Sequence, residues 1–173
     1  MSRISLSQLL LKCCCLALIL LLGASSLFTP TAAAILRQHQ DAPGIRRYHA
    51  QVSIKDASAH AWQVVLYKVF KPGFKTEIHL RLVGFPGIAE FAHPQPLEIL
   101  TSQGKLLSAS DVYAESAPAP NVGEYKFTDV LSTLATTDGL KLYLPLQDGQ
   151  RLTLQIPKNA VTEWQLLVTD IND

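Results

Sequence analysis

The residues best suited to chemistry lie in and beside one glycine- and proline-rich stretch, LVGFPGIAEFAHPQPLEI, at positions 82–99. Glu90 and His93 are three residues apart within it, and His79 precedes it on a strand-like segment. Zinc and related ions accept imidazole and carboxylate ligands, so these three residues are weak candidates for a metal site. However, His79 alternates with charged neighbours as on a solvated strand, and the prolines limit any helix to a single turn. We therefore predict no metal site and no cofactor.

Acid–base catalysis is the second chemistry that the side chains permit. Glu90, Glu98 and Asp111 could each act as a general acid or base. Catalytic carboxylates need converging geometry and shifted pKa values, whereas a carboxylate on a loop is most often a solvated surface group. The chain has neither a G-x-S-x-G elbow nor a glycine-rich loop that opens a helix. We name no catalytic residue, and a non-catalytic protein is favoured over an enzyme.

Backbone geometry explains the glycines and prolines of this stretch. Residues 85–88 read Phe-Pro-Gly-Ile, which places proline and glycine at the centre of a type II turn. Gly84 before the turn indicates a bulge or a close backbone approach at the end of the strand. The apolar side chains on the turn could face the core, or they could form an exposed docking surface. With the second proline-rich loop, the predicted binding residues are Phe85, Pro86, Ile88, Glu90, Phe91, His93, Pro118, Pro120 and Asn121.

The first predicted hairpin leads directly into this stretch. Residues 62–70 and 75–83 are rich in β-branched and aromatic residues and flank a Pro-Gly pair. If Pro72 and Gly73 form the centre of the turn, Lys68 lies opposite Glu77 as a favourable charge pair. The expected core face then consists of Val65, Tyr67, Val69, Ile78, Leu80 and Leu82.

Two further hairpins follow. Residues 97–101 and 106–110 flank a turn at Gln103 and Gly104. Residues 140–146 and 150–156 flank a three-residue loop with Gly149 in the left-handed conformation, because only that register pairs leucines with leucines across the strands. The expected pairs are Leu142 with Leu154 and Leu144 with Leu152.

Two segments have helical spacing. Residues 127–135 place Val130, Leu131 and Leu134 on one side after a Thr128 or Asp129 cap. Residues 157–169 begin with proline and carry an apolar stripe that includes Trp164, and this stripe needs a sheet to cover. Residues 115–125 read as a proline-rich loop. The predicted fold is α+β, with a mainly antiparallel sheet, either curved or arranged as a sandwich or partial barrel of hairpins. Two short helices, the last of them C-terminal, pack on it.

The N-terminal region predicts export. Arg3 and Lys12 precede an apolar run, and three alanines at 32–34 offer a cleavage site, so residues 1–34 are expected to be a cleavable signal peptide. The apolar run is short for a membrane span, and the cysteines precede it, which argues against a membrane or lipid anchor. We expect residues 35–46 to form a flexible lead-in and residues 47–173 to form a single globular domain.

Charge and cysteine content exclude several classes of protein. All three cysteines lie in the expected signal peptide, so the mature chain has neither a disulfide nor a thiol nucleophile. Loss of Arg3 and Lys12 leaves 13 basic and 14 acidic residues, and the charges are scattered along the sequence apart from Arg46 and Arg47. We therefore expect no nucleic acid among the partners.

The sequence LRLVGFPGIAEFAHPQPLEI, with APNVGEY, AVTEWQLL and the earlier DAPGIRRYHAQVSIKDASAHAWQ, resembles a cyanobacterial family of small secreted proteins classed as a domain of unknown function. The resemblance covers nearly all of the mature chain. It supplies no catalytic residue or cofactor, and it implies an organism with thylakoids.

These patterns lead to one preferred function. We expect an exported, soluble, non-catalytic accessory protein of the thylakoid lumen or periplasm that docks on a membrane protein complex, photosynthetic or of the envelope, through its proline-rich loops. The alternative is a small-molecule-binding protein or a metal-dependent hydrolase with a pocket between sheet and helix. Oligomeric state stays open.

Overall fold

The computed structural model describes residues 35–42, 45–70, 73–113, 117–134, 139–147, 149 and 151–169, with side chains from residue 48 onward. The expected signal peptide at 1–34 lies outside these ranges. Among the described residues, no helix is both long and apolar enough to cross a membrane.

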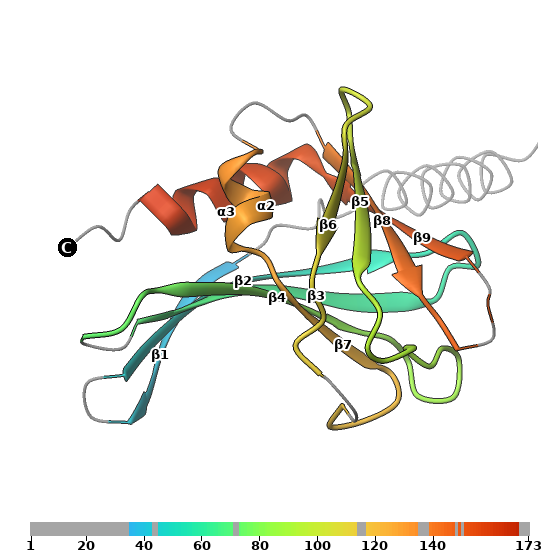
Figure 1. Cartoon of the computed structure of the whole chain (residues 1–173), viewed down its shortest axis with the longest axis horizontal. Coiled ribbons are helices and arrows are strands. Elements are labelled where there is room, and N and C mark those ends of the chain that lie inside the picture. The colour runs from blue at the N-terminus through green and yellow to red at the C-terminus, as the bar shows by residue number, and fades with distance from the viewer. Residues whose placement is uncertain are drawn as a thin grey trace, which may run out of the picture. The chain divides into compact units, whose positions relative to one another are not determined.

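The larger sheet has five antiparallel strands in the order β1-β2-β3-β4-β7 (Figure 1). The strands are β1 (Ile35–Ala42), β2 (Ile45–Lys55), β3 (Ala61–Phe70), β4 (Glu77–Val83) and β7 (Val122–Lys126). The expected flexible lead-in at residues 35–46 instead supplies β1 and the start of β2. The physical reason is that β1 provides hydrogen-bonding partners for the backbone along the edge of β2.

The smaller sheet has four antiparallel strands in the order β6-β5-β8-β9. It consists of β5 (Leu97–Thr101), β6 (Leu106–Ala109), β8 (Gly139–Pro145) and β9 (Arg151–Pro157). Leu142 lies opposite Leu154 and Leu144 opposite Leu152, as the leucine spacing predicted. Gly149 has a φ of 69°, so the predicted left-handed position in the connecting loop is confirmed.

The two sheets join where the chain leaves β6. The amide of Val112 donates to the carbonyl of Glu124 at 2.8 Å, and that of Lys126 donates to the carbonyl of Ser110 at 2.9 Å. Residues 110–112 thus continue the smaller sheet onto the β7 edge of the larger one. The described strands form two joined sheets and no closed barrel, so the predicted mainly antiparallel α+β fold is confirmed.

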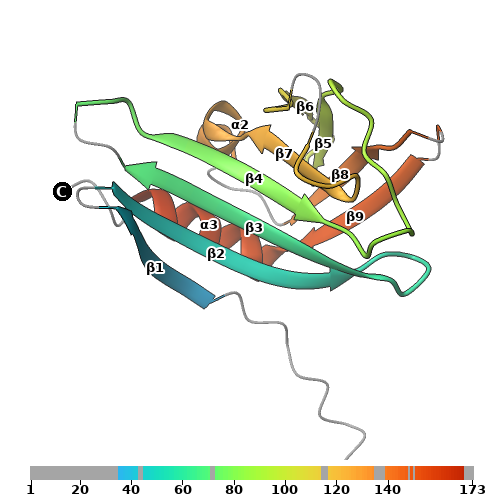
Figure 2. The ribbon, with the colours of Figure 1, turned by 90° about the horizontal axis from the view of Figure 1, so that it is seen from below.

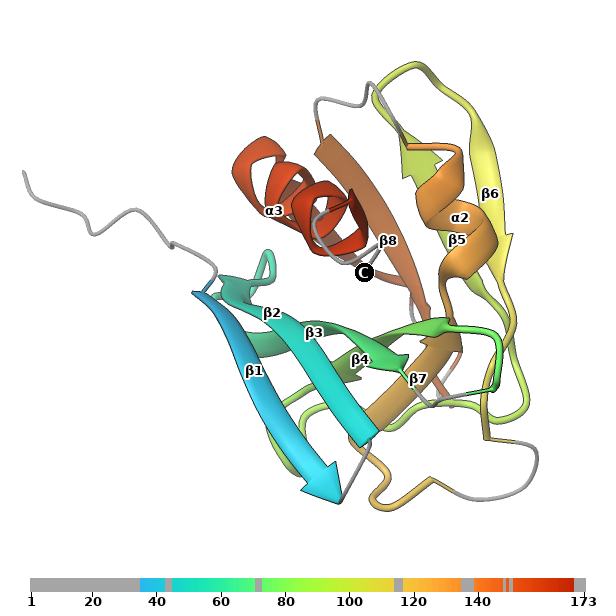
Figure 3. The same ribbon diagram turned by 90° about the vertical axis from the view of Figure 1, so that its left-hand side faces the viewer.

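Both helices lie on the inner side of the sheets. Helix α3 (Lys158–Thr169) contacts β2 and β3 of one sheet and β8 and β9 of the other, and it occupies the angle between them (Figure 3). Trp164 of α3 is fully buried, with its ring edge-on to Phe127 at 5.8 Å between centroids. Helix α2 (Thr128–Ser132) buries Val130 and Leu131 as predicted. Its N-cap is Phe127 rather than Thr128 or Asp129, because the Thr128 hydroxyl accepts a hydrogen bond from the amide of Ile78 instead.

The predicted register of the first hairpin was wrong by one residue. Val69 lies opposite Glu77, and Lys68 lies opposite Ile78. The connection between β3 and β4 runs over residues 71–76, so it is not the two-residue turn that was expected. The longer connection reverses the faces of β3. The core side chains of this strand are therefore Trp62, Val64 and Leu66, which were expected to lie on the opposite face.

The proline-rich loop expected at residues 115–125 was too long. Its second half forms β7, which pairs with β4 and places Leu82 opposite Gly123. Gly123 lies so close to the ring of Phe91 that an added Cβ would be 2.8 Å from it. Glycine here is thus required by close packing inside a strand, and it does not mark a loop.

Candidate functional site

The predicted turn at Phe85 is present. The amide of Ile88 donates to the carbonyl of Phe85 at 3.2 Å, and Gly87 has a φ of 78°. This geometry turns Phe85 and Ile88 outward, with 64% and 46% of their surface exposed. Pro86 is exposed between them. The turn therefore presents two large apolar side chains to solvent.

The base of the turn is fixed by Trp62. A Cβ added to Gly84 would lie 2.8 Å from the indole ring, so only glycine lets the chain cross the ring here. The indole Nε1 donates to Asp56 Oδ2 at 3.0 Å, and this holds the ring in place. The sequence predicted a bulge or a close backbone approach at Gly84, and the structure shows the backbone of Gly84 in close approach to the Trp62 side chain.

The two proline-rich loops lie side by side. The amide of Gly84 donates to the carbonyl of Asn121 at 3.0 Å, and Asn121 Nδ2 donates to the carbonyl of Gly84 at 2.7 Å. The amide of Phe91 donates to the carbonyl of Pro120 at 2.8 Å. We call the exposed part of these loops the proline-loop surface; it consists of Phe85, Pro86, Ile88, Pro118 and Pro120.

Phe91 does not belong to that surface. It is fully buried, with its ring edge-on to Trp62 at 6.1 Å between centroids and tilted against Tyr125 at 6.4 Å. Its neighbour Glu90 is exposed, and the carbonyl of Glu90 accepts a hydrogen bond from the amide of Gln147. Phe91 therefore anchors the first loop in the core while the turn before it faces outward.

His93 lies at the inner end of the same loop. Its Nδ1 is 2.7 Å from Asp111 Oδ2, and both side chains are largely buried. Asp111 also accepts hydrogen bonds from the amides of Tyr113 at 2.9 Å and Gln95 at 3.3 Å. His93 thus links the first loop to the segment that joins the two sheets.

The three weak metal candidates occupy separate surroundings. His79 contacts Glu124, His93 contacts Asp111, and Glu90 is exposed on the loop. Across the described part of the chain, no group of three histidine, cysteine, aspartate or glutamate side chains is placed to hold a metal ion.

Glu124, which the sequence analysis did not identify, has four side-chain partners among the described residues. Its side chain is almost fully buried on the side of the larger sheet away from α3. The carboxylate accepts hydrogen bonds from the hydroxyl of Tyr67, from the hydroxyl of Tyr113 at 3.0 Å and from Arg81 Nε at 2.8 Å. Arg81 Nη2 lies 2.6 Å away, and His79 Nδ1 lies 3.0 Å away. We call these five side chains the Glu124 network.

Hydrogen bonds and charge set the ionisation of this network. Burial alone would raise the pKa of Glu124, but hydrogen bonds from His79, Tyr67 and Arg81, with the charge of Arg81, lower that pKa to about 2. The hydrogen bond to Glu124 raises the pKa of His79, against the opposing effect of burial. The network is therefore an ionic anchor, which ties the Tyr113 segment to β3, β4 and β7.

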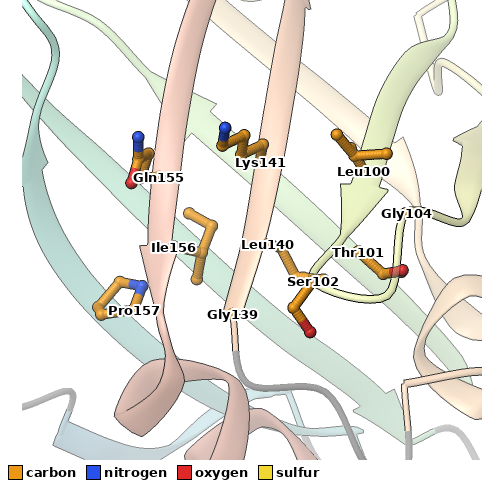
Figure 4. Close-up of a pocket in the computed structure, with 10 residues that line it drawn as sticks. All are labelled: Leu100, Thr101, Ser102, Gly104, Gly139, Leu140, Lys141, Gln155, Ile156 and Pro157. Atoms are coloured by element: carbon orange, nitrogen blue, oxygen red, sulfur yellow. The ribbon is translucent and has the colours of Figure 1, made fainter.

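A hollow with a described lining lies at one end of the smaller sheet. It has a volume of about 500 Å³ and is formed by β5, β8 and β9 (Figure 4). Gly139 lines the hollow without a side chain. Lys141 is the only ionisable residue in the lining. This composition offers no acid–base pair. The hollow is bordered by the strands and the β5–β6 turn, whereas the alternative function requires a pocket between sheet and helix.

Comparison with known proteins identifies the family of this chain. No curated protein and no solved structure matches the chain. One family model matches residues 34–167, a range that includes both proline-rich loops, the Glu124 network and nearly all of α3. The chain belongs to the family described as "Protein of unknown function (DUF3122)".

Proposed function

We propose that the protein is an exported, non-catalytic accessory protein that docks on a membrane protein complex through the proline-loop surface. The observation that carries this proposal is the pairing of the two loops. They form one surface that is bonded to the core and exposes Phe85 and Ile88.

The exposed side chains favour a protein partner with an apolar pocket. Aromatic side chains are enriched at the centres of protein interfaces, where a few buried residues contribute most of the binding energy. Phe85 is adjacent to a second large apolar side chain, Ile88, and to Pro86. Such a group is the right size to fill one pocket on the extramembrane part of a larger protein.

The rigidity of the loops also supports docking. Gly84 is fixed against Trp62 on one side and against Asn121 on the other. Phe91 fixes the far end of the loop in the core. A surface that is already ordered loses little conformational entropy on binding, so more of the contact energy appears as affinity.

The proposed location follows from the N-terminal sequence. The basic residues, apolar run and alanine-rich site at residues 1–34 are those of a secretory signal peptide. Given the resemblance to cyanobacterial secreted proteins, the exported chain would reside in the thylakoid lumen or the periplasm. Either compartment would place the proline-loop surface next to membrane proteins.

Co-purification from solubilised cyanobacterial membranes tests the proposal. The tagged chain is compared with a Phe85→Ser/Ile88→Ser variant and with a matched Leu106→Ser/Leu166→Ser control. The control residues are 59% and 51% exposed but lie on β6 and α3. The wild type and the control should recover the same membrane complex in constant ratio. The Phe85/Ile88 variant should recover at least about tenfold less, since two central anchors contribute roughly 2 kcal/mol or more.

Three results would contradict the proposal. They are recovery of no membrane protein by the wild type, equal loss in both double variants, and full retention by the Phe85/Ile88 variant. Fractionation of lumen and periplasm before solubilisation tests the location separately, because a chain found only in the cytoplasm contradicts export whatever it binds.

A further inference from the structure

The larger sheet has one face with no helix on it among the described residues. Helix α3 covers the face that carries Val64 and Leu66. The opposite face of β1 to β4 has no helix on it (Figure 2), and on that face Tyr67, His79 and Glu124 are largely buried in the Glu124 network. On β2 and β3, Gln51, Ser53 and Gln63 alternate with core residues and are exposed on this side. We call it the outer face of the larger sheet.

Strand register brings basic residues together on this outer face. One row of directly opposed positions crosses all five strands: Arg37, His49, Tyr67, His79 and Lys126. Opposed residues in neighbouring strands lie on the same face of a sheet. Four of the five positions in this row therefore hold basic residue types, although the residues are scattered over 90 positions of the sequence.

Basic residues also occupy the adjoining rows of the outer face. Arg47, Lys55 and Arg81 occupy outer-face positions by register, as does His39 opposite Arg47. Asp41 lies at the β1 bulge, outside the paired register.

Among the paired positions of the described strands, those on the outer face that hold acidic residues are Glu77 and Glu124. Glu124 is buried in its contacts with Arg81 and His79, so little of its charge reaches the surface. Arg81 and Glu124 neutralise each other, so the outer face carries four further lysine or arginine positions against Glu77. The mature chain has 13 basic and 14 acidic residues, so an excess of positive charge on this face is balanced by an excess of acidic residues elsewhere in the chain.

An exposed aromatic residue lies at the rim of this face. Phe74, in the connection between β3 and β4, has 74% of its surface exposed, and Lys75 beside it is exposed as well. Aromatic side chains favour the interface between water and lipid, and basic residues near an anionic bilayer contribute roughly 1 kcal/mol each. Phe74 and Lys75 form the pattern expected of a membrane-contacting edge.

We propose that the outer face, with Phe74 at its rim, binds an anionic lipid surface. Five strands span about 20 Å, and the basic positions are spread across that width. A hollow of about 170 Å³ beside β4 and β7 includes only His79 and Lys126 of these basic positions. A broad positive face with an aromatic rim matches an extended negative surface. This surface is distinct from the proline-loop surface, so the two proposals can fail independently.

Vesicle co-sedimentation of the mature chain tests this inference. The vesicles are phosphatidylcholine alone or phosphatidylcholine with about 30 mol% phosphatidylglycerol, each at low and high salt. The chain should bind the anionic vesicles, leave the neutral ones and dissociate as salt rises. A Lys55→Glu/Lys126→Glu variant should bind at least about 25-fold more weakly, since each basic residue at such a surface contributes roughly a fivefold factor.

The matched control is Lys105→Glu/Lys141→Glu. It makes the same change in net charge at exposed lysines of the smaller sheet and its turn. It should bind within about threefold of the wild type, because only screened long-range repulsion is added. Phe74→Ser, which leaves the charge unchanged, should also weaken binding, and thermal melts of all variants confirm folding.

Several outcomes would overturn the inference. Equal loss in the two charge-reversal variants would show a response to net charge alone, with no contribution from the outer face. Binding to neutral vesicles that salt does not weaken would assign the interaction to apolar groups. Displacement from anionic vesicles by equimolar poly-glutamate would assign the face to an acidic protein partner instead of lipid.

Discussion

Replacing Glu124 with glutamine tests how the outer face and the Tyr113 segment are held together. Glutamine keeps the size of the side chain but removes the charge that His79 and Arg81 neutralise. It also leaves those two groups without their anion. Removing one partner of a buried ion pair typically costs about 3–5 kcal/mol, because the remaining charge stays buried and uncompensated.

The ionisation of Glu124 gives an independent magnitude. Its pKa falls from 4.5 to about 2 in the folded chain. Since one pKa unit corresponds to roughly 1.4 kcal/mol, the ionised carboxylate contributes about 3 kcal/mol at neutral pH. Because the folded-state pKa is below the unfolded one, this stability is present above pH 4.5 and is lost as pH falls towards 2. Glu124→Gln should therefore lower the free energy of unfolding by about 3 kcal/mol at pH 7 and by much less near pH 2.

Urea unfolding of wild type and variant between pH 2 and 7 measures this difference. Glu98→Gln on β5 is the matched control, because Glu98 is exposed and should change stability by less than about 0.5 kcal/mol. At each pH, the free energy of unfolding of the variant is subtracted from that of the wild type. This difference removes the contribution of the carboxylates that both proteins share. A loss below about 1 kcal/mol at pH 7, or a loss that does not shrink on acidification, would refute the assignment of Glu124 as an ionic anchor.

Three further changes probe the core and the network. Gly123→Ala should destabilise by about 1–3 kcal/mol in urea melts, because the new Cβ would lie 2.8 Å from the Phe91 ring; a neutral result would mean that the ring can move aside. Trp164→Ala should cost about 3–5 kcal/mol in the same assay, and a cost below about 1 kcal/mol would show that α3 is not docked. The raised pKa of His79 stabilises the fold below pH 6.5, and that stability is lost as pH rises through the folded-state value. His79→Gln should therefore differ most from the wild type near pH 6 and least near pH 9, and a constant difference would exclude the Glu124 contact as the cause.

The parts of the fold that could be predicted are those where one register alone satisfies the pattern. In β8 and β9, every second residue is leucine or isoleucine. A shift of one residue in the register would therefore expose a whole row of these side chains to solvent. In β3, Val65 and Val69 on one side are about as apolar as Val64 and Leu66 on the other. Strand β3 therefore has no polar face that fixes its register. The register between β3 and β4 is set instead by the length of the connection between them.

The proline-rich turn was predicted well because proline and glycine constrain the backbone directly. Whether Phe85 and Phe91 face inward or outward could not be predicted, because both are phenylalanines on the same loop. Phe91 faces inward because it packs against Trp62 and Tyr125.

The Glu124 network and the basic outer face could not be found in the sequence for a different reason. The positions of Arg37, His79 and Lys126 are far apart in the chain, and they meet only through the register of four strand pairs. An error of one residue in the β3–β4 register breaks that row. Val122, Glu124 and Lys126 stand at every second position of β7, and this spacing was the available signal for a strand. The neighbouring prolines and glycine led to the prediction of a loop instead.

Site-specific photo-crosslinking in intact cells tests the docking proposal most directly. A photoreactive residue is placed at position 85, on the proline-loop surface, or at position 106, an apolar site of similar exposure on β6. Docking predicts that position 85 crosslinks to one membrane protein and that position 106 does not. A chain that crosslinks to no membrane protein from position 85, or equally from both positions, would contradict it.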